Sequence, residues 1–388
     1  MSNAATDIQL DALLTQDPSF LVQQQRSRFE HVLELFGESF VLFGAGALGR
    51  AALLSLRKAG IEPRAFADNN PQLWNKIVDG VPVLSPTEAA EQFGHNTLFV
   101  ATVYTSEPVR HQLRKLGVNS TSFAALAWNY PQAFLPHCAL DLPHQIFKQA
   151  DAVRAAATLW ADESSHREYL GQLRWRTSLD PDSLPPHDAP ADTYFPRDLV
   201  PLSPKEVFVD CGAYDGATIR SFVERGGASF RQIVGLEPDP HNFTLLQETV
   251  AALPDEVKQR CRLWPLAAGA RREKLQFNAT GTVCSTVGIG DTEVDCAPLD
   301  EILADCAPTY IKFDVEGAEL DALEGCRNVI RAARPVLAVC LYHRQDHLWR
   351  VPALLRAQSS KYRFFLRRYS DECWELVCYA IPLERLLR

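Results

Sequence analysis

Two turns that carry glycine and acidic residues hold most of the chemistry that this sequence can support. In the stronger one, VFVDCGAYDGATIRSF, an apolar run leads into an amphipathic helix, and the bend between them contains Gly212 and Gly216. Glycine has no Cβ, so a ligand can approach the backbone at these two positions. Asp210 and Asp215 flank it, so a pyrophosphate would meet like charge, whereas a ligand with an amine, a ribose and a sulfonium group suits it.

The next apolar run ends in LEPDP and places Glu237 at the end of a predicted strand, 27 residues after Asp210. In nucleoside-binding α/β folds, an acid at this position accepts hydrogen bonds from both ribose hydroxyls. Residues 207–241 therefore predict a site for a nucleoside-type ligand.

A second group of reactive side chains follows two later strands. Lys312, Asp314, Glu316 and Glu319 lie in YIKFDVEGAEL, and His343 follows another strand in CLYHRQDH. The carboxyl ends of parallel strands line one crevice, so we expect these side chains to meet there. His343 is our choice of general base, because the ordinary pKa of imidazole lies near neutral pH. Asp314 or Glu316 would orient its ring or hold a ligand.

His347, four residues after His343, could share a helix face with it, but a solvated helix residue is the stronger expectation. An Asp/Glu/His group also permits a divalent metal ion. A second clear carboxylate pair is lacking, so we expect no metal.

A weaker candidate lies near the N-terminus, where FVLFGAGALGR contains Gly44, Gly46 and Gly49, and Asp68 follows 24 residues after Gly44. Glycines between a strand and a helix, followed by an acid after the next strand, are typical of dinucleotide sites. The segment AFADNNPQLWNKIVDGVPVLSP also resembles nucleotide-binding domains that precede sugar-modifying enzymes, which implies NAD or a nucleotide sugar. The alternative is a Rossmann-like domain that has lost its ligand and serves in assembly.

The C-terminal half resembles class I S-adenosylmethionine-dependent methyltransferases and, more narrowly, the FkbM family of O-methyltransferases. The resemblance is carried by VFVDCGAYDG, GLEPDPHNFTLL, PLAAGARREKLQFN, PLDEIL with YIKFDVEGAELDALEGC, and CLYHRQDHLW, which together cover roughly residues 205–381. It implies a seven-stranded sheet with the methyl donor over the carboxyl ends of its first and second strands.

The resemblance also implies roles for individual residues. The donor loop would consist of Asp210, Gly212, Ala213, Tyr214, Asp215 and Gly216; Glu237, with Pro238 and Asp239 beside it, would hold the ribose, and Ala267 and Ala268 would lie beside the adenine. Lys312, Asp314, Glu316 and His343 would serve the reaction, because a sugar-like hydroxyl is a poor nucleophile and needs a positioned base.

The elements that position these residues alternate between strand and helix, which predicts an α/β protein. We expect a helical segment at 1–36, a Rossmann-like nucleotide-binding domain at 37–140, a helical and Pro-rich linker at 141–204, and a methyltransferase domain at 205–388. In the last domain, strands are expected at VFVDC, QIVGLE, CRLWPLAA, YIKFDV and VLAVCLY, and the sheet should end in an antiparallel hairpin of YRFFLRR and CWELVCYAIP.

Two connecting segments are unusual. The linker DPDSLPPHDAPADTYFPRDLVPLSP is too rich in proline for a continuous helix or a central strand. Its aromatic pair, Tyr194 and Phe195, indicates that part of it packs near a site. The segment GTVCSTVGIGD, residues 281–291, is either a loop that closes on a ligand or a solvent hairpin.

Composition excludes several classes. The chain has 48 Asp and Glu residues and 39 Lys and Arg residues, which gives a net charge of −9. This charge disfavours nonspecific binding to nucleic acid. The motif Asp-Val-Glu-Gly also differs from the Asn/Asp-Pro-Pro-Tyr type that acts on base amino groups. No apolar run approaches the roughly 20 residues of a membrane span. The ten cysteines include no CxxC pair, and MSNAATDIQL is no signal peptide. A cytoplasmic protein, able to form homo-oligomers, is expected.

These observations predict an S-adenosylmethionine-dependent O-methyltransferase whose small-molecule or glycan acceptor offers the hydroxyl of a sugar, glycan or polyhydroxylated metabolite. One alternative is an NAD-dependent oxidoreductase built around Gly44 to Asp68. The other is a nonenzymatic, nucleotide-sensing scaffold with an inactive methyltransferase domain. The presence of both Asp210 and Glu237 argues against the inactive version.

Overall fold

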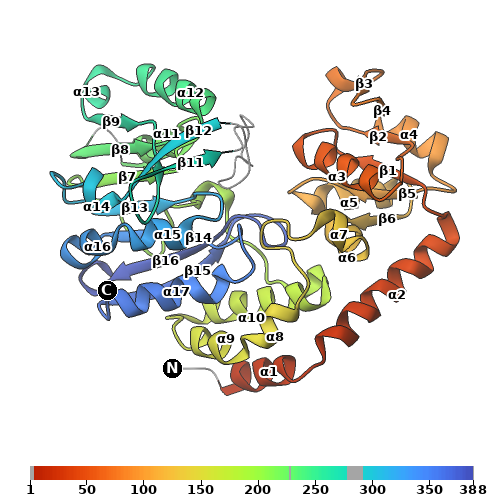
Figure 1. The fold of residues 1–388 in the computed structure, drawn as a ribbon, viewed down its shortest axis with the longest axis horizontal. Coiled ribbons are helices and arrows are strands. Elements are labelled where there is room, and N and C mark those ends of the chain that lie inside the picture. The colour runs from red at the N-terminus through yellow and green to blue at the C-terminus, as the bar shows by residue number, and fades with distance from the viewer. Residues whose placement is uncertain (1–3, 227–228, 278–291, 388) are drawn as a thin grey trace.

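The chain folds into two lobes, each organised around an open α/β sheet (Figure 1). This computed structural model describes residues 4–226, 229–277 and 292–387. The segment 281–291, for which a closing loop or a solvent hairpin is expected, lies outside the described residues. Within those ranges, none of the helices is both long and apolar enough to span a bilayer.

The sheet of the N-terminal lobe has the strand order β3-β4-β2-β1-β5-β6 among the described residues. All its pairings are parallel except β3 with β4. Alternate residues of β1 belong to different cores: Leu42 packs with α3 and α6, and Val41 packs with α4 and α5. Helices therefore cover both faces. The elements are β1 Phe40–Phe43, α3 Ala47–Lys58, β2 Ala65–Ala67, β3 Ile77–Val78, β4 Val81–Leu84, α4 Pro86–Phe93, β5 Leu98–Ala101, α5 Ser106–Lys115, β6 Ser120–Ser122 and α6 Phe123–Asn129.

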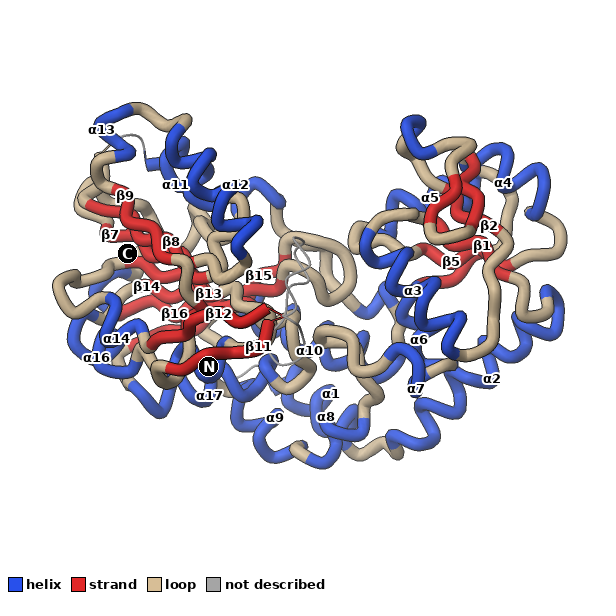
Figure 2. Tube along the Cα trace, turned by 45° about the horizontal axis from the view of Figure 1, so that its top comes forward, coloured by secondary structure: helices blue, strands red, loops and turns tan. Residues whose placement is uncertain are grey.

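Helices that precede and follow this sheet connect the two lobes (Figure 2). The largely buried helix α10 packs against β15 of the C-terminal sheet and also against α1 and α2. The connecting helices are α1 Ala4–Leu14, α2 Pro18–Phe36, α7 Pro131–Phe134, α8 His144–Lys148, α9 Ala150–Ala157 and α10 Glu163–Ser178.

The C-terminal lobe contains a seven-stranded sheet, within the described part of the chain, of order β15-β16-β14-β13-β7-β8-β9. Strands β14, β13, β7, β8 and β9 run parallel, and the antiparallel pair β15 and β16 completes the sheet, as predicted. The strands are β7 Val207–Cys211, β8 Gln232–Leu236, β9 Cys261–Trp264, β13 Tyr310–Phe313, β14 Val336–Cys340, β15 Tyr362–Arg368 and β16 Leu376–Pro382. The helices are α11 Ala217–Gly226, α12 Pro240–Ala251, α13 Asp255–Lys258, α14 Leu299–Ile302, α15 Glu319–Glu324, α16 Arg327–Ala333 and α17 His347–Gln358.

The prediction of a single strand at CRLWPLAA is wrong. Its first half is β9 at the edge of the large sheet, but Ala267–Ala268 forms β10 in a separate sheet of order β10-β12-β11, with β11 at Glu273–Phe277 and β12 at Thr292–Ala297. Pro265 lies between the two halves and has no backbone N–H to continue a ladder. The break moves the two alanines out of the large sheet and onto the wall of a cavity.

Candidate functional site

The candidate site is a cavity of ≈ 840 Å³ at the carboxyl ends of the C-terminal strands. The chain leaves β7 toward β8 on one side and returns to β13 on the other. Loops therefore diverge between β7 and β13, and open α/β sheets bind ligands at such a switch point. The cavity lies near the upper end of the range of about 300–1,000 Å³ that is usual for small-molecule sites.

The loop between β7 and α11 forms one wall of the cavity, and its backbone requires glycine. Gly212 has φ +81°, and a Cβ added there would lie 1.8 Å from the carbonyl oxygen of Asp314. Gly216 has φ +84°, and Tyr214, between them, has φ 50°. Gly212, Ala213, Tyr214 and Asp215 line the cavity. The loop thus brings backbone close to the ligand space, as the sequence predicts for a donor loop.

Glu237, directly after β8, holds this loop. Its Oε2 accepts a hydrogen bond from the backbone N–H of Tyr214 at 2.9 Å, and its Oε1 accepts one from the N–H of Asp239, also at 2.9 Å. The residue is 5% exposed and lines the cavity with Pro238. Burial raises the pKa of Glu237 to about 6, although both N–H groups oppose the shift.

Two neighbouring acids cap helices. Asp239 accepts hydrogen bonds from the N–H groups of His241 and Asn242 and so begins α12; it is 1% exposed and does not line the cavity. Asp215 accepts from the N–H of Ala217 at the start of α11 and does line the cavity. A direct ligand contact therefore fits Asp215 better than Asp239.

Asp210 and Lys312 form a buried ion pair beneath the loop. They are register partners on the parallel strands β7 and β13, and Nζ of Lys312 lies 2.9 Å from Oδ1 of Asp210. The same Nζ donates to the carbonyl oxygen of Gly212 at 2.7 Å. Burial lowers the pKa of Lys312, but the charges of Asp210 and Asp314 raise it more, so the net shift is upward. Lys312 is a fixed cation that positions the loop.

Asp314, after β13, is held by two phenols. Its Oδ2 accepts a hydrogen bond from Tyr194 at 2.8 Å, and its Oδ1 accepts one from Tyr342 at 3.0 Å. Burial raises the pKa of Asp314, but the positive charges of Lys312 and His343 lower it by more. The net shift is downward, so Asp314 is ionised. The contact with Tyr194 confirms that the aromatic pair of the proline-rich linker packs near the site.

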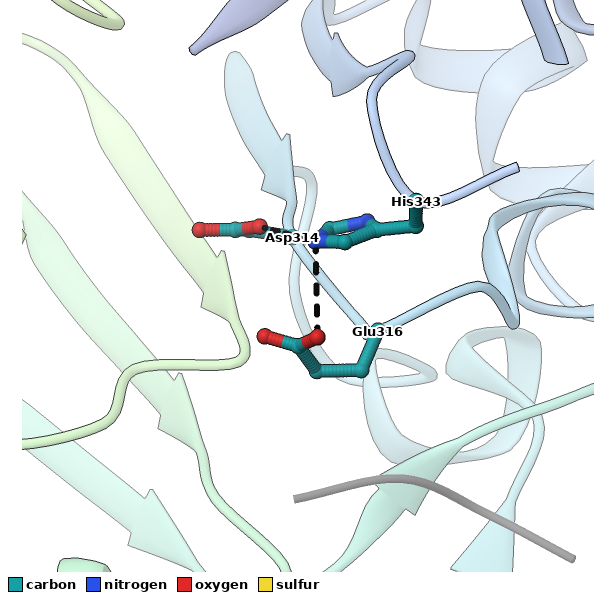
Figure 3. Close-up of side chains that lie close together, drawn as sticks. All are labelled: Asp314, Glu316 and His343. Carbon is teal, nitrogen blue, oxygen red and sulfur yellow. Dashed lines mark ion pairs between the residues drawn. The ribbon is translucent and has the colours of Figure 1, made fainter. Parts of the chain in front are cut away.

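His343 lies where the sequence predicts, next to Asp314 and Glu316 (Figure 3). Its Nδ1 also lies 2.7 Å from Glu319, which the sequence placed in the same group of side chains without assigning it to the histidine. Burial lowers the pKa of His343, but these carboxylates outweigh it and raise the pKa to about 10. The expectation of a pKa near neutrality is therefore wrong. Burial also raises the pKa of Glu316, to about 8.

The expectation of a solvated His347 is wrong as well. This side chain, the first residue of α17, is fully buried, and its Nδ1 lies 3.0 Å from Oε2 of Glu319. Glu319 thus lies between two imidazoles, and it also accepts a hydrogen bond from the N–H of Val315 at 3.1 Å. The pattern His-x-x-x-His contained this signal, but only the fold shows that both rings face one carboxylate.

The remaining wall comes from segments far away in the sequence. Tyr104 and Thr105 of the N-terminal lobe line the cavity with Trp374, and the rings of Tyr104 and Trp374 lie 4.6 Å apart. The lobes are joined beside them, because the N–H of Glu107, in the first turn of α5, donates to Asp371 at 2.7 Å. The cavity therefore lies between the loop after β7 and the N-terminal lobe.

Glu375 is a further cavity residue that the sequence did not single out. Burial raises its pKa to about 7, and Asp314 adds to the shift. It lies in the connection between β15 and β16, next to Trp374, where nothing in the local pattern distinguishes it from an ordinary turn residue.

The N-terminal glycine turn has a similar internal geometry. The N–H of Ala45 donates to Oδ2 of Asp68 at 2.7 Å, as Tyr214 does to Glu237. Gly44 has φ +114°, whereas a Cβ on Gly46 would meet no atom within 4 Å. A Cβ on Gly49 would lie 1.8 Å from the carbonyl oxygen of Gly44, so helix α3 packs tightly on the turn. None of these residues lines the ≈ 840 Å³ cavity.

Comparisons with known proteins concern the family and the fold. Residues 210–372 match the family model described as the methyltransferase FkbM domain. The fold resembles the crystal structure of methyltransferase FkbM from Methylobacillus flagellatus KT, with a TM-score of 0.75 and 23% identity over 97% of this chain and 98% of that one. A search among curated proteins finds no significant match.

Two other solved structures overlap only in part. Precorrin-6y C5,15-methyltransferase from Geobacter metallireducens GS-15 gives a TM-score of 0.30 and 13% identity, covering 49% of this chain and 83% of that chain. UDP-D-quinovosamine 4-dehydrogenase from Vibrio fischeri gives a TM-score of 0.18 and 19% identity, covering 22% of this chain and 75% of that chain.

Proposed function

We propose that the protein, whose residues 210–372 match the methyltransferase FkbM domain, transfers a methyl group from S-adenosylmethionine to a hydroxyl of a sugar, glycan or similarly polyhydroxylated metabolite. The observation that carries the proposal is the pairing of Glu237 with the donor loop at the switch point of the sheet. The proposed compartment is the cytoplasm, in keeping with the free cysteines among the described residues.

The donor would lie along the wall formed by the loop after β7, with its ribose at Glu237. That carboxylate keeps lone pairs for two ribose hydroxyls beyond the two N–H bonds that it accepts. The adenine would lie near Ala267 and Ala268, small side chains that leave room for a flat ring. Asp215 offers the donor's amine an anionic partner.

The acceptor would lie between the donor and the N-terminal lobe. Tyr104 and Trp374 offer aromatic surface, and Asp314, Glu316 and His343 offer polar groups, a mixture that suits a polyhydroxylated ring. In the reaction the hydroxyl oxygen bonds to the methyl carbon, and the carbon–sulfur bond breaks with its electron pair staying on sulfur. The hydroxyl proton passes to the Asp314–Glu316–His343 cluster, whose groups titrate as a coupled unit. Alignment and exclusion of water supply much of the rate acceleration.

A second ligand is proposed for the N-terminal lobe, namely NAD or a nucleotide sugar at the turn from Gly44 to Gly49. The specific observation in its favour is the open space at Gly46, beside the N-terminus of α3. Helix N-termini favour phosphate groups.

The decisive experiment is native mass spectrometry of the purified protein, followed by calorimetry with S-adenosylmethionine and S-adenosylhomocysteine. We expect either nucleoside to bind at one site per chain, and Glu237→Ala to weaken that binding. Incubation with methyl-labelled donor and a library of sugars and glycans should then transfer label to an acceptor hydroxyl. Failure of both nucleosides to bind would favour the scaffold alternative.

A further inference from the structure

The spacing of three side chains on the acceptor side of the cavity is that of a metal site. Asp314, Glu316 and His343 each offer one ligand atom, and these atoms lie within 4.8 Å of one another (Figure 3). Nε2 of His343 lies 3.4 Å from Oδ1 of Asp314 and 3.6 Å from Oε2 of Glu316. Ligand atoms about 2.1 Å from one ion and at right angles to each other lie about 3 Å apart. A small movement of the three side chains toward one another would bring all three ligand atoms to coordination distance from one ion.

The imidazole of His343 supplies a second, independent observation. The residue is only 7% exposed, yet its Nε2 makes no hydrogen bond in the described structure. Its described contacts are the 3.4 and 3.6 Å approaches to the two carboxylates, and a buried ring nitrogen without a hydrogen bond is costly unless a ligand completes it. This nitrogen points toward the two carboxylates (Figure 3).

The neighbours of the three side chains orient them as metal ligands require. Nδ1 of His343 lies 2.7 Å from Glu319, so Nε2 is the ring nitrogen that is left to face an ion, and a bound ion would take the place of the proton on Nε2. Glu319 is fixed in turn by the N–H of Val315. Tyr194 donates to the other oxygen of Asp314, so Oδ1 is the oxygen that faces the histidine.

We propose that Asp314, Glu316 and His343 bind one divalent transition-metal ion such as Mn²⁺ or Zn²⁺. One imidazole with two carboxylates suits Mn²⁺ or Zn²⁺ better than Ca²⁺, which prefers oxygen ligands alone. The three residues line the cavity, so the remaining coordination positions face it. An acceptor hydroxyl beside the donor methyl group would be the ligand at these remaining positions. Only this part of the proposal rests on the proposed function.

The test measures binding of the metal alone to the full-length protein. Titration with Mn²⁺, followed by the electron paramagnetic resonance of free Mn²⁺, should show one saturable site per chain, and calorimetry with Zn²⁺ should agree. Glu316→Gln and His343→Ala should each abolish that site. Glu319→Gln, which removes none of the three ligands but changes the group that holds Nδ1 of His343, should weaken metal binding by about 10–100-fold. Glu273→Gln is the matched control, because Glu273 lines the same cavity but lies on β11, outside the cluster, and should leave binding unchanged.

Calorimetry with S-adenosylhomocysteine on the same samples separates this proposal from the proposed function. Retained nucleoside binding shows that a variant is folded, and loss of metal binding then assigns the ligands. The metal site is overturned if neither Mn²⁺ nor Zn²⁺ binds saturably, or if Glu316→Gln and His343→Ala bind as tightly as the wild type. Failure of the wild type to bind any nucleoside would overturn the proposed function and leave the metal result standing.

Discussion

The backbone N–H of Tyr214 donates a 2.9 Å hydrogen bond to the carboxylate of Glu237, which ties the glycine loop after one strand to the end of the next. The two residues are 23 positions apart and belong to neighbouring parallel strands. The carboxylate that is proposed to hold the ribose therefore also shapes the loop that is proposed to hold the rest of the donor.

Glu237→Ala is expected to weaken S-adenosylmethionine binding by about 1.5–3 kcal/mol, the range for hydrogen bonds to a charged group. Calorimetry gives the dissociation constant. Glu316→Gln, a carboxylate on the acceptor side, should bind the donor like the wild type. Equal affinity of Glu237→Ala and the wild type would contradict the placement of the ribose.

Donor affinity should also depend on pH through Glu237. Its pKa is raised to about 6, and only the ionised form accepts hydrogen bonds from both ribose hydroxyls. Affinity should be constant above about pH 7 and fall as the pH drops through 6, approaching tenfold per pH unit. Glu237→Gln should bind weakly with little change over this window. A wild-type affinity that is equal at pH 5 and pH 7.5 would contradict the prediction.

Lys312→Met should destabilise the C-terminal lobe by about 3–5 kcal/mol, because it leaves the charge of Asp210 buried without a partner. Urea unfolding measures the loss. The double variant Asp210→Asn/Lys312→Met removes both charges and should be more stable than Lys312→Met alone. If both unfold alike, the ion pair is not the cause.

Gly46→Val tests the N-terminal site. A Cβ at this position would meet no atom within 4 Å, so the fold should persist while the proposed phosphate space is filled. NAD, NADP and UDP-sugars should be screened by thermal shift, and a ligand that raises the melting temperature of the wild type should fail to do so in the variant. The shift caused by S-adenosylmethionine should survive in both proteins. No shift with any nucleotide would favour a role in assembly.

His343→Ala should lower turnover on the identified acceptor by about 10²–10⁴, the range for loss of a group that handles a proton. Donor affinity should stay unchanged, because the proposed donor contacts come from β7 and β8. His111→Ala, an exposed histidine of the N-terminal lobe, provides the comparison. Near-normal turnover of His343→Ala would remove this residue from the reaction. EDTA followed by added Mn²⁺ reports separately on the metal.

Much of this protein could be predicted from its sequence, because the features concerned are local. Parallel strands with buried faces are mostly apolar, and Gly212 and Gly216 mark a turn whose positive φ angles favour glycine. Glu237 and Asp314 follow such strands directly, so their place at the carboxyl edge follows from the strand assignment. The antiparallel hairpin at the end of the sheet is local as well.

The tertiary structure alone decided which groups share an environment. His343 contacts Glu319, 24 residues away in the sequence, and Asp314 contacts Tyr194, 120 residues away. Contacts at such separations produce no periodic pattern in the sequence. Such contacts set the pKa values: three carboxylates around one buried ring raise the pKa of His343 to about 10, where the residue type alone predicts neutrality. The sequence determined where reactive groups lie along the chain. Their charge and mutual distance depend on packing between distant segments, because electrostatic energy depends on separation in space and on burial.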